Sequence, residues 1–303
     1  PCLVCVDCGD APSCPRCSVY LTYHSVTNRL MCHYCGYSEP VTERCLHCGG
    51  ALRPVGAGTQ KVEEELRYEF PDTGILRMDA DTVGASHGHE ALLREFEEKK
   101  IPILLGTQMV AKGLDFENVT LVGVLDADLS LYAQNYHAAE RTYSLLAQVV
   151  GRAGRGEHPG RAVIQTYHPE NEVIQAAAKQ DYETFYQNEL RMRSLRRYPP
   201  FADLFTLTVS GLDELRVIAA ARALCDALRY ACSQPPLKDL EVEVLGPAGA
   251  PVVKVNNRYR YCVYLCGKGG SVLRRTVSEY LLAFYARKEN RGLDIFADCN
   301  ALQ

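Results

Sequence analysis

Residues 2–17 read CLVCVDCGDAPSCPRC and residues 32–48 read CHYCGYSEPVTERCLHC, so that these two stretches hold nine of the 14 cysteines of the chain. Eight of the nine form Cys-x-x-Cys pairs: Cys5/Cys8, Cys14/Cys17, Cys32/Cys35 and Cys45/Cys48. One such pair puts two thiolates on one metal ion at Zn–S distances of about 2.3 Å, and two pairs complete a tetrahedral structural site. The sequence therefore predicts two zinc ions per chain, which would supply most of the folding free energy of this core-poor region, on the order of 10 kcal/mol per site.

The four pairs can share metal ions in sequence, nested or interleaved, and spacing alone does not choose among these arrangements. Residues 19–23 (VYLTY) lie between the second and third pairs and are strand-like, as in the hairpin of a zinc ribbon. This favours the nested arrangement, in which the inner site is Cys14, Cys17, Cys32 and Cys35 and the outer site is Cys5, Cys8, Cys45 and Cys48. Cys2 is then a spare thiol. A disulfide cluster is the alternative, but a long chain without a signal-peptide pattern suits a reducing compartment better.

The composition is that of a globular protein with two or three domains. Of the 303 residues, 47% are hydrophobic, and no apolar run approaches the ~18 residues of a membrane span. The formal net charge of −4 argues against a protein coated in positive charge, so that any nucleic acid must be met by local basic surfaces. We expect a cytoplasmic protein with no membrane contact. Because the chain opens abruptly at Pro1, we also expect it to be part of something longer.

Residues 51–168 alternate between helical and strand patterns. Helices are predicted over residues 60–70, 87–99 and 135–150, and strands over residues 74–79, 101–106, 119–125 and 161–167. Apolar strands separated by helices are typical of a parallel sheet that is covered on both faces. Ligands of such sheets bind at the carboxyl ends of the strands.

Two loops in this region are candidates for chemistry. Residues 106–116 (GTQMVAKGLDF) follow a predicted strand, and residues 148–155 (QVVGRAGR) end the predicted helix 135–150. Glycine lets the backbone approach a partner closely, and arginine makes planar, bidentate contacts to phosphate. Arg152 and Arg155 therefore suit the role of arginine fingers, which stabilise charge on a transferred phosphate. A solvated Arg-Gly turn is the alternative interpretation.

The first loop resembles motif V of superfamily 2 helicases, and the second resembles motif VI. Four further stretches agree with the cysteine pairs and these loops: Gly56-x-Gly58-Thr59, Arg77-x-Asp79-x-Asp81-Thr82, Pro199-Pro200-Phe201 and Leu245-Gly246-Pro247. Essentially the whole chain is thus similar to the PriA family of primosomal replication-restart DNA helicases (primosomal protein N′). The resemblance implies an α/β fold: a second RecA-like helicase lobe, a parallel sheet with flanking helices, that carries a double zinc-ribbon domain.

The resemblance also implies roles for individual residues. The eight paired cysteines would bind zinc in the nested arrangement. Arg152 and Arg155 would act on the γ-phosphate of ATP, with Gln148 positioning it. Coupling of the nucleotide to DNA would involve Gly106, Thr107, Gln108, Lys112, Gly113, Asp115 and Gly151.

The full-length protein would then be an ATP-dependent 3′-5′ DNA helicase that assembles primosomes at stalled forks. The sequence contains no Gly-x-x-x-x-Gly-Lys-Ser/Thr loop and no Asp-Glu-x-His box, so that the phosphate cradle and the Mg²⁺ ligands would belong to another motor lobe. We therefore expect this chain alone to be inactive. A non-catalytic DNA- and protein-binding platform, and another superfamily 2 (RNA) helicase, remain as alternatives.

The carboxyl-terminal part follows two helices, predicted over residues 170–179 and 182–195. Strands over residues 204–210, 242–245, 258–265 and 293–297 and helices over residues 213–232 and 271–288 give the order β-α-β-β-α-β. This order is typical of a ferredoxin-like α+β domain. The chain thus divides into a zinc-binding domain (residues 1–50), a helicase lobe with trailing helices (51–198) and a DNA- and partner-binding domain (199–303).

Two pairs of arginines in the last domain are candidate contacts. Strand alternation puts Arg258 and Arg260 on one face with Lys254, and Tyr259 and Tyr261 on the other. Basic residues interleaved with aromatic ones suit single-stranded DNA, although alternating tyrosines are also ordinary core residues.

Arg274 and Arg275 are predicted in the first turn of the helix 271–288, where an anion would be stabilised by the helix N-terminus. A salt bridge to Glu279 is the alternative for these two arginines. In the family, the carboxyl-terminal domain helps to bind the acidic tail of single-stranded DNA-binding protein. The resemblance thus implies three kinds of partner: single-stranded and forked DNA, single-stranded DNA-binding protein and other primosome proteins.

Overall fold

The computed structural model describes residues 2–24, 27–55, 58–79, 82, 88–107, 119–132, 135–153 and 159–301. The chain divides into two compact units. One unit is Ala57–Arg191, and the other combines Pro1–Gly56 with Met192–Gln303. The cysteine-rich segment and the carboxyl-terminal segment, predicted as separate domains, therefore belong to one compact unit.

The cysteine-rich segment contains two small antiparallel sheets. β1 (Cys2–Cys5) pairs with β5 (Leu52–Val55), and β2 (Thr22–His24), β3 (Arg29–Met31) and β4 (Ser38–Pro40) form the second sheet. Leu21 and Leu30 are each 1% exposed and pack against buried cysteines. Half of the buried residues in this core are cysteines, so that the segment has few purely apolar side chains to stabilise it. β5 extends this segment beyond residue 50. Of the strand-like residues 19–23, only the last two lie in a strand.

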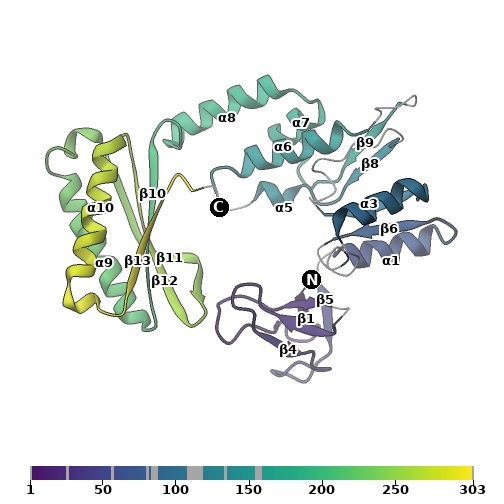
Figure 1. Cartoon of the computed structure of the whole chain (residues 1–303), viewed down its shortest axis with the longest axis horizontal. Coiled ribbons are helices and arrows are strands. Elements are labelled where there is room, and N and C mark those ends of the chain that lie inside the picture. Colours follow the sequence, from purple (N-terminus) through teal and green to yellow (C-terminus); the bar gives the residue numbers. More distant parts are fainter. Residues whose placement is uncertain are drawn as a thin grey trace. The chain divides into compact units, whose positions relative to one another are not determined.

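The unit Ala57–Arg191 is built from parallel strands and flanking helices. Its strands are β6 (Ile75–Met78), β7 (Ile103–Gly106), β8 (Leu121–Val124) and β9 (Arg161–Ile164), and they pair in parallel as β6–β7 and β8–β9. Its helices are α1 (Thr59–Glu69), α3 (His89–Glu98), α5 (Asp128–Leu131), α6 (Ala138–Val150) and α7 (Glu172–Ala178). Figure 1 shows α1 and α3 on opposite sides of β6. This is the predicted class of parallel strands covered by helices.

The carboxyl-terminal segment follows α8 (Tyr182–Arg196), which has residues in both units. It contains β10 (Asp203–Gly211), α9 (Glu214–Cys232), the short helix η1 (Lys238–Leu240), β11 (Glu243–Val255), β12 (Arg258–Gly267), α10 (Gly270–Ala286), the short helix η2 (Lys288–Asn290) and β13 (Asp294–Cys299). The sheet order is β11-β12-β10-β13, with every neighbouring pair antiparallel. The predicted β-α-β-β-α-β order is confirmed.

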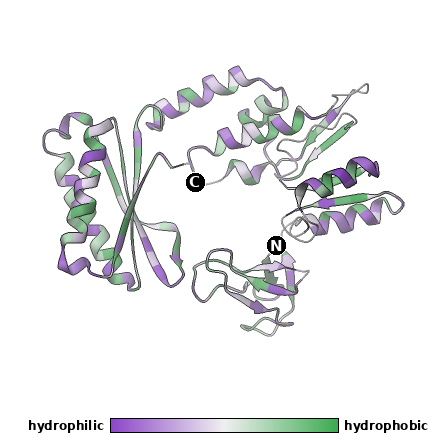
Figure 2. Ribbon diagram, in the orientation of Figure 1, coloured by the Kyte–Doolittle hydropathy of each residue, from purple (hydrophilic) through white to green (hydrophobic). Residues whose placement is uncertain are grey.

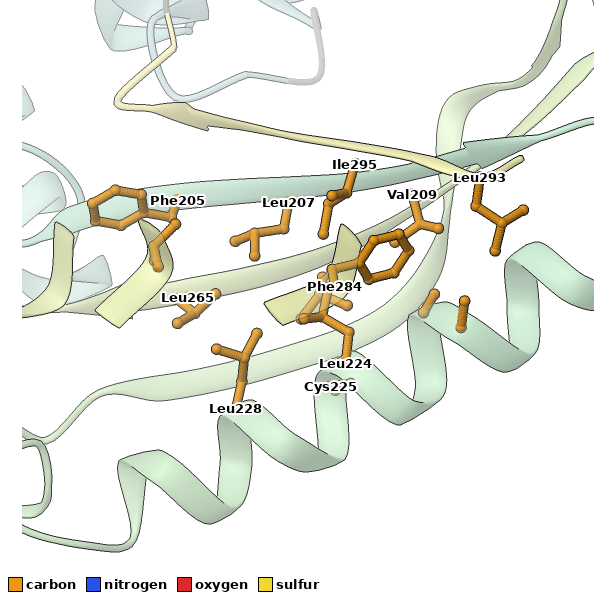
Figure 3. Close-up of a cluster of buried hydrophobic side chains, with 14 of the residues drawn as sticks. Phe205, Leu207, Val209, Leu224, Cys225, Leu228, Leu265, Phe284, Leu293 and Ile295 are labelled. Atoms are coloured by element: carbon orange, nitrogen blue, oxygen red, sulfur yellow. The ribbon is translucent and has the colours of Figure 1, made fainter. Parts of the chain in front are cut away.

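One apolar core holds this last sheet to its two helices. Figure 1 shows α9 and α10 on the same face of the sheet, and in Figure 2 both helices have hydrophilic and hydrophobic residues, as expected of helices half in solvent. In Figure 3, strand side chains such as Leu207 and Val209 point toward Leu224 and Leu228 of α9. Leu207, Val209 and Leu228 are fully buried, so that each contributes about 1.5–3 kcal/mol of transfer free energy.

β11 is longer than predicted, since the sequence pattern indicated only residues 242–245. Pro247 and Pro251 interrupt the pattern, because proline cannot donate to a strand ladder. The structure accommodates both prolines on an edge strand whose register with β12 shifts between Leu245 and Ala248 and again between Gly249 and Lys254. Within the described residues, no helix is long and apolar enough to cross a membrane.

Candidate functional site

The eight paired cysteines gather in two clusters of four thiols. One cluster is Cys5, Cys8, Cys45 and Cys48, and the other is Cys14, Cys17, Cys32 and Cys35, with all sulfur atoms of a cluster within 4.8 Å of one another. This is the nested grouping, and none of these cysteines forms a disulfide. Close Sγ–Sγ pairs are 3.4 Å (Cys5–Cys48), 3.7 Å (Cys8–Cys45) and 3.6 Å (Cys14–Cys35). Four thiolates about 2.3 Å from a tetrahedral zinc ion would lie about 3.8 Å apart, so that the donor sets fit Zn²⁺.

Each Cys-x-x-Cys pair lies in a tight turn, here called a zinc knuckle. In all four knuckles the N–H of the first cysteine donates to the carbonyl five residues later: Asp10, Val19, Tyr37 and Gly50. Three knuckles have a glycine directly after the second cysteine, with a φ of 74° at Gly9, 72° at Gly36 and 78° at Gly49. Each of these glycines donates its N–H back to the first cysteine. Glycine is favoured here because the backbone is left-handed. The pattern Cys-x-x-Cys-Gly is therefore a sequence signal for this turn that the prediction from cysteine spacing did not include.

Backbone hydrogen bonds and burial shift the pKa values of the clustered thiols. The pKa of Cys5 falls from 9.0 to about 7, chiefly because the backbone N–H of Cys8 donates to its sulfur. Burial is the main reason that the pKa of Cys17 rises to about 12, and the backbone N–H of Asn256 opposes this rise. Four thiols so close together cannot all ionise without mutual repulsion, which a divalent cation removes. Cys2 lies outside both clusters, and its Sγ is 4.0 Å from the carbonyl oxygen of Val55.

The residues that resemble motif V begin at the carboxyl end of a strand. Gly106 ends β7, opposite Met78 of β6, and Thr107 follows it with an exposed side chain. This is the edge of a parallel sheet at which ligands bind. The other predicted residues of this loop lie outside the described residues: Gln108, Lys112, Gly113 and Asp115.

The residues that resemble motif VI lie at the end of α6. Gln148 is exposed in the last turn, and Gly151 caps the helix by donating its N–H to the carbonyl of Ala147. A Cβ on Gly151 would lie 2.8 Å from Nε2 of Gln180 and 3.1 Å from the Ala147 oxygen, so that glycine permits a close approach here. Arg152 continues this turn, whereas Arg155 lies outside the described residues.

A buried carboxylate near motif V was not singled out from the sequence. Asp79 follows β6 and is 7% exposed. Its carboxylate accepts hydrogen bonds from Oγ1 of Thr59 (2.6 Å) and the N–H of Thr82 (3.0 Å), and it pairs with Arg77 (3.1 Å). Burial opposes its ionisation, but the contacts with Thr59, Thr82 and Arg77 hold the pKa of Asp79 below its usual value. Two of the family-like stretches, 56–59 and 77–82, therefore meet through this carboxylate, a contact that only the fold reveals.

The basic residues of the β11–β12 hairpin lie on two faces, not one. Tyr259 and Tyr261 pack against the apolar core of the domain, which is the ordinary role that the sequence left open for them. Arg258 and Arg260 alternate with these tyrosines on β12 and so lie on the opposite face of the strand. Lys254 pairs directly with Tyr259, and its Nζ lies 5.5 Å from the centre of that ring. The prediction that Lys254 shares the face of Arg258 is wrong, because the two-residue turn at 256–257 reverses the chain.

Three of the four candidate arginines of this segment, Arg258, Arg274 and Arg275, have carboxylate partners within the chain. Arg258 donates to Ser210 and pairs with Asp294. Arg275 pairs with Glu279 at 2.9 Å, the alternative that the sequence left open.

Asp203 occupies the anion position at the start of α10. Its Oδ2 accepts from the N–H of Gly270 at 3.2 Å, and its Oδ1 lies 3.8 Å from Arg274. Because α10 begins at Gly270, Arg274 and Arg275 lie beyond the first turn in which they were predicted.

Three family models match separate parts of the chain. They are the PriA DNA helicase Cys-rich region (CRR) domain over residues 14–40, the helicase conserved C-terminal domain over residues 58–157 and the primosomal protein N C-terminal domain over residues 194–300. The first match covers the inner cysteine cluster. The second includes Gly106, Thr107, Gln148 and Arg152, and the third covers the β-α-β-β-α-β segment.

Curated relatives agree with these matches. The replication restart protein PriA of Bacillus subtilis (strain 168) is 42% identical over 299 residues, which are 98% of this chain and 36% of the relative. PriA of Synechocystis is 42% identical over 262 residues (85% of this chain, 31% of the relative), and PriA of Rickettsia conorii is 35% identical over 267 residues (88% and 40%). The chain thus spans between about a third and two-fifths of the length of these relatives. Together with the two four-cysteine clusters and the helix-flanked parallel strands, these matches show that the chain belongs to the PriA family of replication restart proteins.

Proposed function

We propose that the full-length protein is an ATP-dependent 3′-5′ DNA helicase that acts in replication restart and assembles primosomes at stalled forks. This chain contributes a zinc-binding domain (residues 1–55, to the end of β5), a second motor lobe (residues 56–198) and a carboxyl-terminal domain (residues 199–303). One observation carries the proposal. Gly106 and Thr107 of motif V and Gln148, Gly151 and Arg152 of motif VI lie at the ends of β7 and α6, inside the stretch that matches the helicase conserved C-terminal domain.

Each loop has a separate task in this proposal. Arg152 and Arg155 stabilise charge on the γ-phosphate, and Gln148 orients it. Gly106, Thr107, Gln108, Lys112, Gly113 and Asp115 transmit the state of the nucleotide to the DNA strand, and Gly151 sets where Arg152 lies. ATP and Mg²⁺, which supply the transferred phosphate and its charge neutralisation, are held by motifs that this sequence does not contain. The reducing cytoplasm, the location we propose, keeps the eight thiols available to zinc.

The test is ATP hydrolysis by the full-length protein in the presence of single-stranded DNA. We expect Arg155→Ala to lower turnover by roughly 10³-fold or more, with DNA affinity nearly unchanged. Arg161→Ala, at an exposed arginine of β9, is the matched control and should turn over as wild type does. Normal turnover in Arg155→Ala would remove the arginine-finger assignment. No DNA-stimulated turnover in the wild-type protein would favour the non-catalytic platform instead.

We propose that the carboxyl-terminal domain binds DNA and the acidic tail of single-stranded DNA-binding protein. Arg274 and Arg275 are 63% and 82% exposed, so that their ion pairs with Asp203 and Glu279 are weak enough to be exchanged for another carboxylate. A labelled tail peptide should lose affinity for Arg274→Glu/Arg275→Glu, with strong salt dependence in the wild type. Equal affinities would exclude this site. For DNA, Arg260→Ala should weaken single-strand binding more than Arg258→Ala, because Asp294 already neutralises Arg258.

A further inference from the structure

One of the four zinc knuckles lacks the glycine that follows the second cysteine in the others. In the other three, a left-handed glycine follows the second cysteine and donates its N–H back to the first cysteine. The knuckle Cys14–Cys17 has Ser18 in that position. The N–H of Ser18 donates instead to the carbonyl of Lys254, at 2.9 Å and 236 residues away along the chain. This knuckle is therefore hydrogen-bonded to the carboxyl-terminal segment.

The turn between β11 and β12 makes several hydrogen bonds to the Cys14–Cys17 knuckle. The N–H of Asn256 donates to Sγ of Cys17 at 3.2 Å, and the N–H of Asn257 donates to the carbonyl of Arg16 at 2.8 Å. The N–H of Lys254 donates to Oγ of Ser18 at 2.9 Å. Backbone groups thus pair in both directions between the knuckle and the hairpin, as between two strands.

The geometry of the turn makes these donors available. Asn256 and Asn257 have φ values of 49° and 63°, and they join Val255 to Arg258, the last ladder pair of the hairpin. Such a two-residue turn favours asparagine, and the N–H groups of its central residues lie beyond the ladder. Val255, just before the turn, packs against the small core of the cysteine-rich segment. The hairpin therefore meets the inner cluster with both polar and apolar contacts.

We propose that the β11–β12 turn is a structural part of the inner zinc site, so that zinc binding by Cys14, Cys17, Cys32 and Cys35 and docking of the carboxyl-terminal domain stabilise each other. An N–H that donates to a metal-bound thiolate is a charge-assisted hydrogen bond, and losing such a second-layer contact typically weakens metal binding 10–100-fold. By linkage, removing the inner zinc ion weakens docking by the same factor. The outer cluster has no such role in docking, since Gly9 and Gly49 close both of its knuckles.

Zinc release from the 303-residue chain to a chromophoric chelator tests the first half of this linkage. Asn256→Pro removes the N–H that donates to Cys17 and cannot adopt the positive φ, whereas the matched control Asn256→Gly keeps both. We expect one of the two zinc ions to leave about 10–100-fold faster in Asn256→Pro, with the other unchanged, and Asn256→Gly to behave as wild type. Equal release from the two variants would overturn the proposal.

Hydrogen exchange tests whether the inner zinc site stabilises docking of the hairpin. This test does not require the Asn256→Pro variant to fold. Cys14→Ser, which removes a ligand of the inner site, should speed the exchange of the three amides that donate to the knuckle, those of Lys254, Asn256 and Asn257. The amides of α9 and β10, which belong to the separate core, should stay protected. Cys8→Ser, in the outer site, is the matched control and should leave the hairpin protected. Unchanged exchange of these three amides in Cys14→Ser would contradict the linkage. An equal loss of their protection in Cys14→Ser and Cys8→Ser would contradict it as well.

Discussion

Oγ1 of Thr59 lies 2.6 Å from Oδ2 of Asp79, which joins the first turn of α1 to the residue that follows β6. Met78, the last residue of β6, pairs with Gly106, the first residue of the motif V loop. The Asp79 carboxylate thus lies beside the strand end at which the residues that resemble motif V begin. Its contacts with Thr59, Thr82 and Arg77 hold that strand end in place.

Asp79→Asn should therefore destabilise the unit Ala57–Arg191, by roughly 1–3 kcal/mol, because it removes a buried acceptor and its charge. The pKa of Asp79 is lower in the folded protein than its usual value of 3.8. Its ionised form thus stabilises the fold above about pH 3.8, and this contribution is lost as the pH falls through the lower folded-state value. The melting temperatures of the wild type and of Asp79→Asn should differ most near neutral pH and converge below pH 3.8. Asp72→Asn, at an exposed residue, is the control, and a difference that persists at low pH would contradict this account.

Metal content should distinguish the spare cysteine from the ligands. We expect two zinc ions per chain in the wild type and in Cys2→Ser, because Cys2 lies outside both clusters. Gly50→Ala should lose zinc from the outer site, since a Cβ there would overlap the Asp7 carboxylate and lie 2.9 Å from Sγ of Cys5. Gly123→Ala, at a glycine with open space around it, should keep both ions. Elemental analysis of the purified variants is the measurement, and zinc loss in Cys2→Ser would count against the nested sites.

Gly151→Ala in the full-length protein should slow ATP turnover, by up to about 100-fold, because the new Cβ displaces the start of the motif VI turn. The added methyl group would press on Gln180 and on the carbonyl of Ala147. Since the Gln180 side chain can give way, Gly151→Ala/Gln180→Ala should recover part of the lost turnover. Gln180→Ala alone should turn over nearly as wild type does. No recovery in the double variant would show that the Ala147 carbonyl, and not Gln180, sets the constraint.

Asp203→Asn should bind the acidic tail peptide more tightly, if Arg274 is the contact proposed above. The Asp203 carboxylate lies near Arg274 and competes with any incoming carboxylate for it. For an exposed ion pair worth up to about 1 kcal/mol, the gain in affinity should be up to about fivefold. Asp239→Asn changes the net charge equally at an exposed residue and serves as the control for fluorescence anisotropy titrations. Equal gains in both variants would show a general charge effect and not competition at Arg274.

Local patterns were sufficient for much of this protein. Cys-x-x-Cys spacing predicted thiols that can share a metal ion, because both ligands of a pair come from one tight turn. Helical and strand periodicity predicted α9, α10 and β12 within a few residues, because each contributes one regular apolar face to a core. Asp213, the first residue of the predicted helix 213–232, caps α9 by accepting from the N–H of Arg216, a contact that depends only on neighbouring residues.

Contacts between distant residues were decided only by the tertiary structure. The sequence favoured the nested cysteine clusters but left other groupings open, because ligand spacing within a turn says nothing about which turns meet. Asp203 caps a helix 67 residues later, and Asn256 donates to Cys17 across 239 residues. Neither contact leaves a periodic or compositional signal, because a single hydrogen bond constrains one backbone N–H and not a pattern of side chains. By itself the sequence determined the thiol pairs, the long helices and most of the strands, but not short helices such as α5. Folding decided how the β11–β12 hairpin comes to complete a metal site more than 200 residues away along the chain.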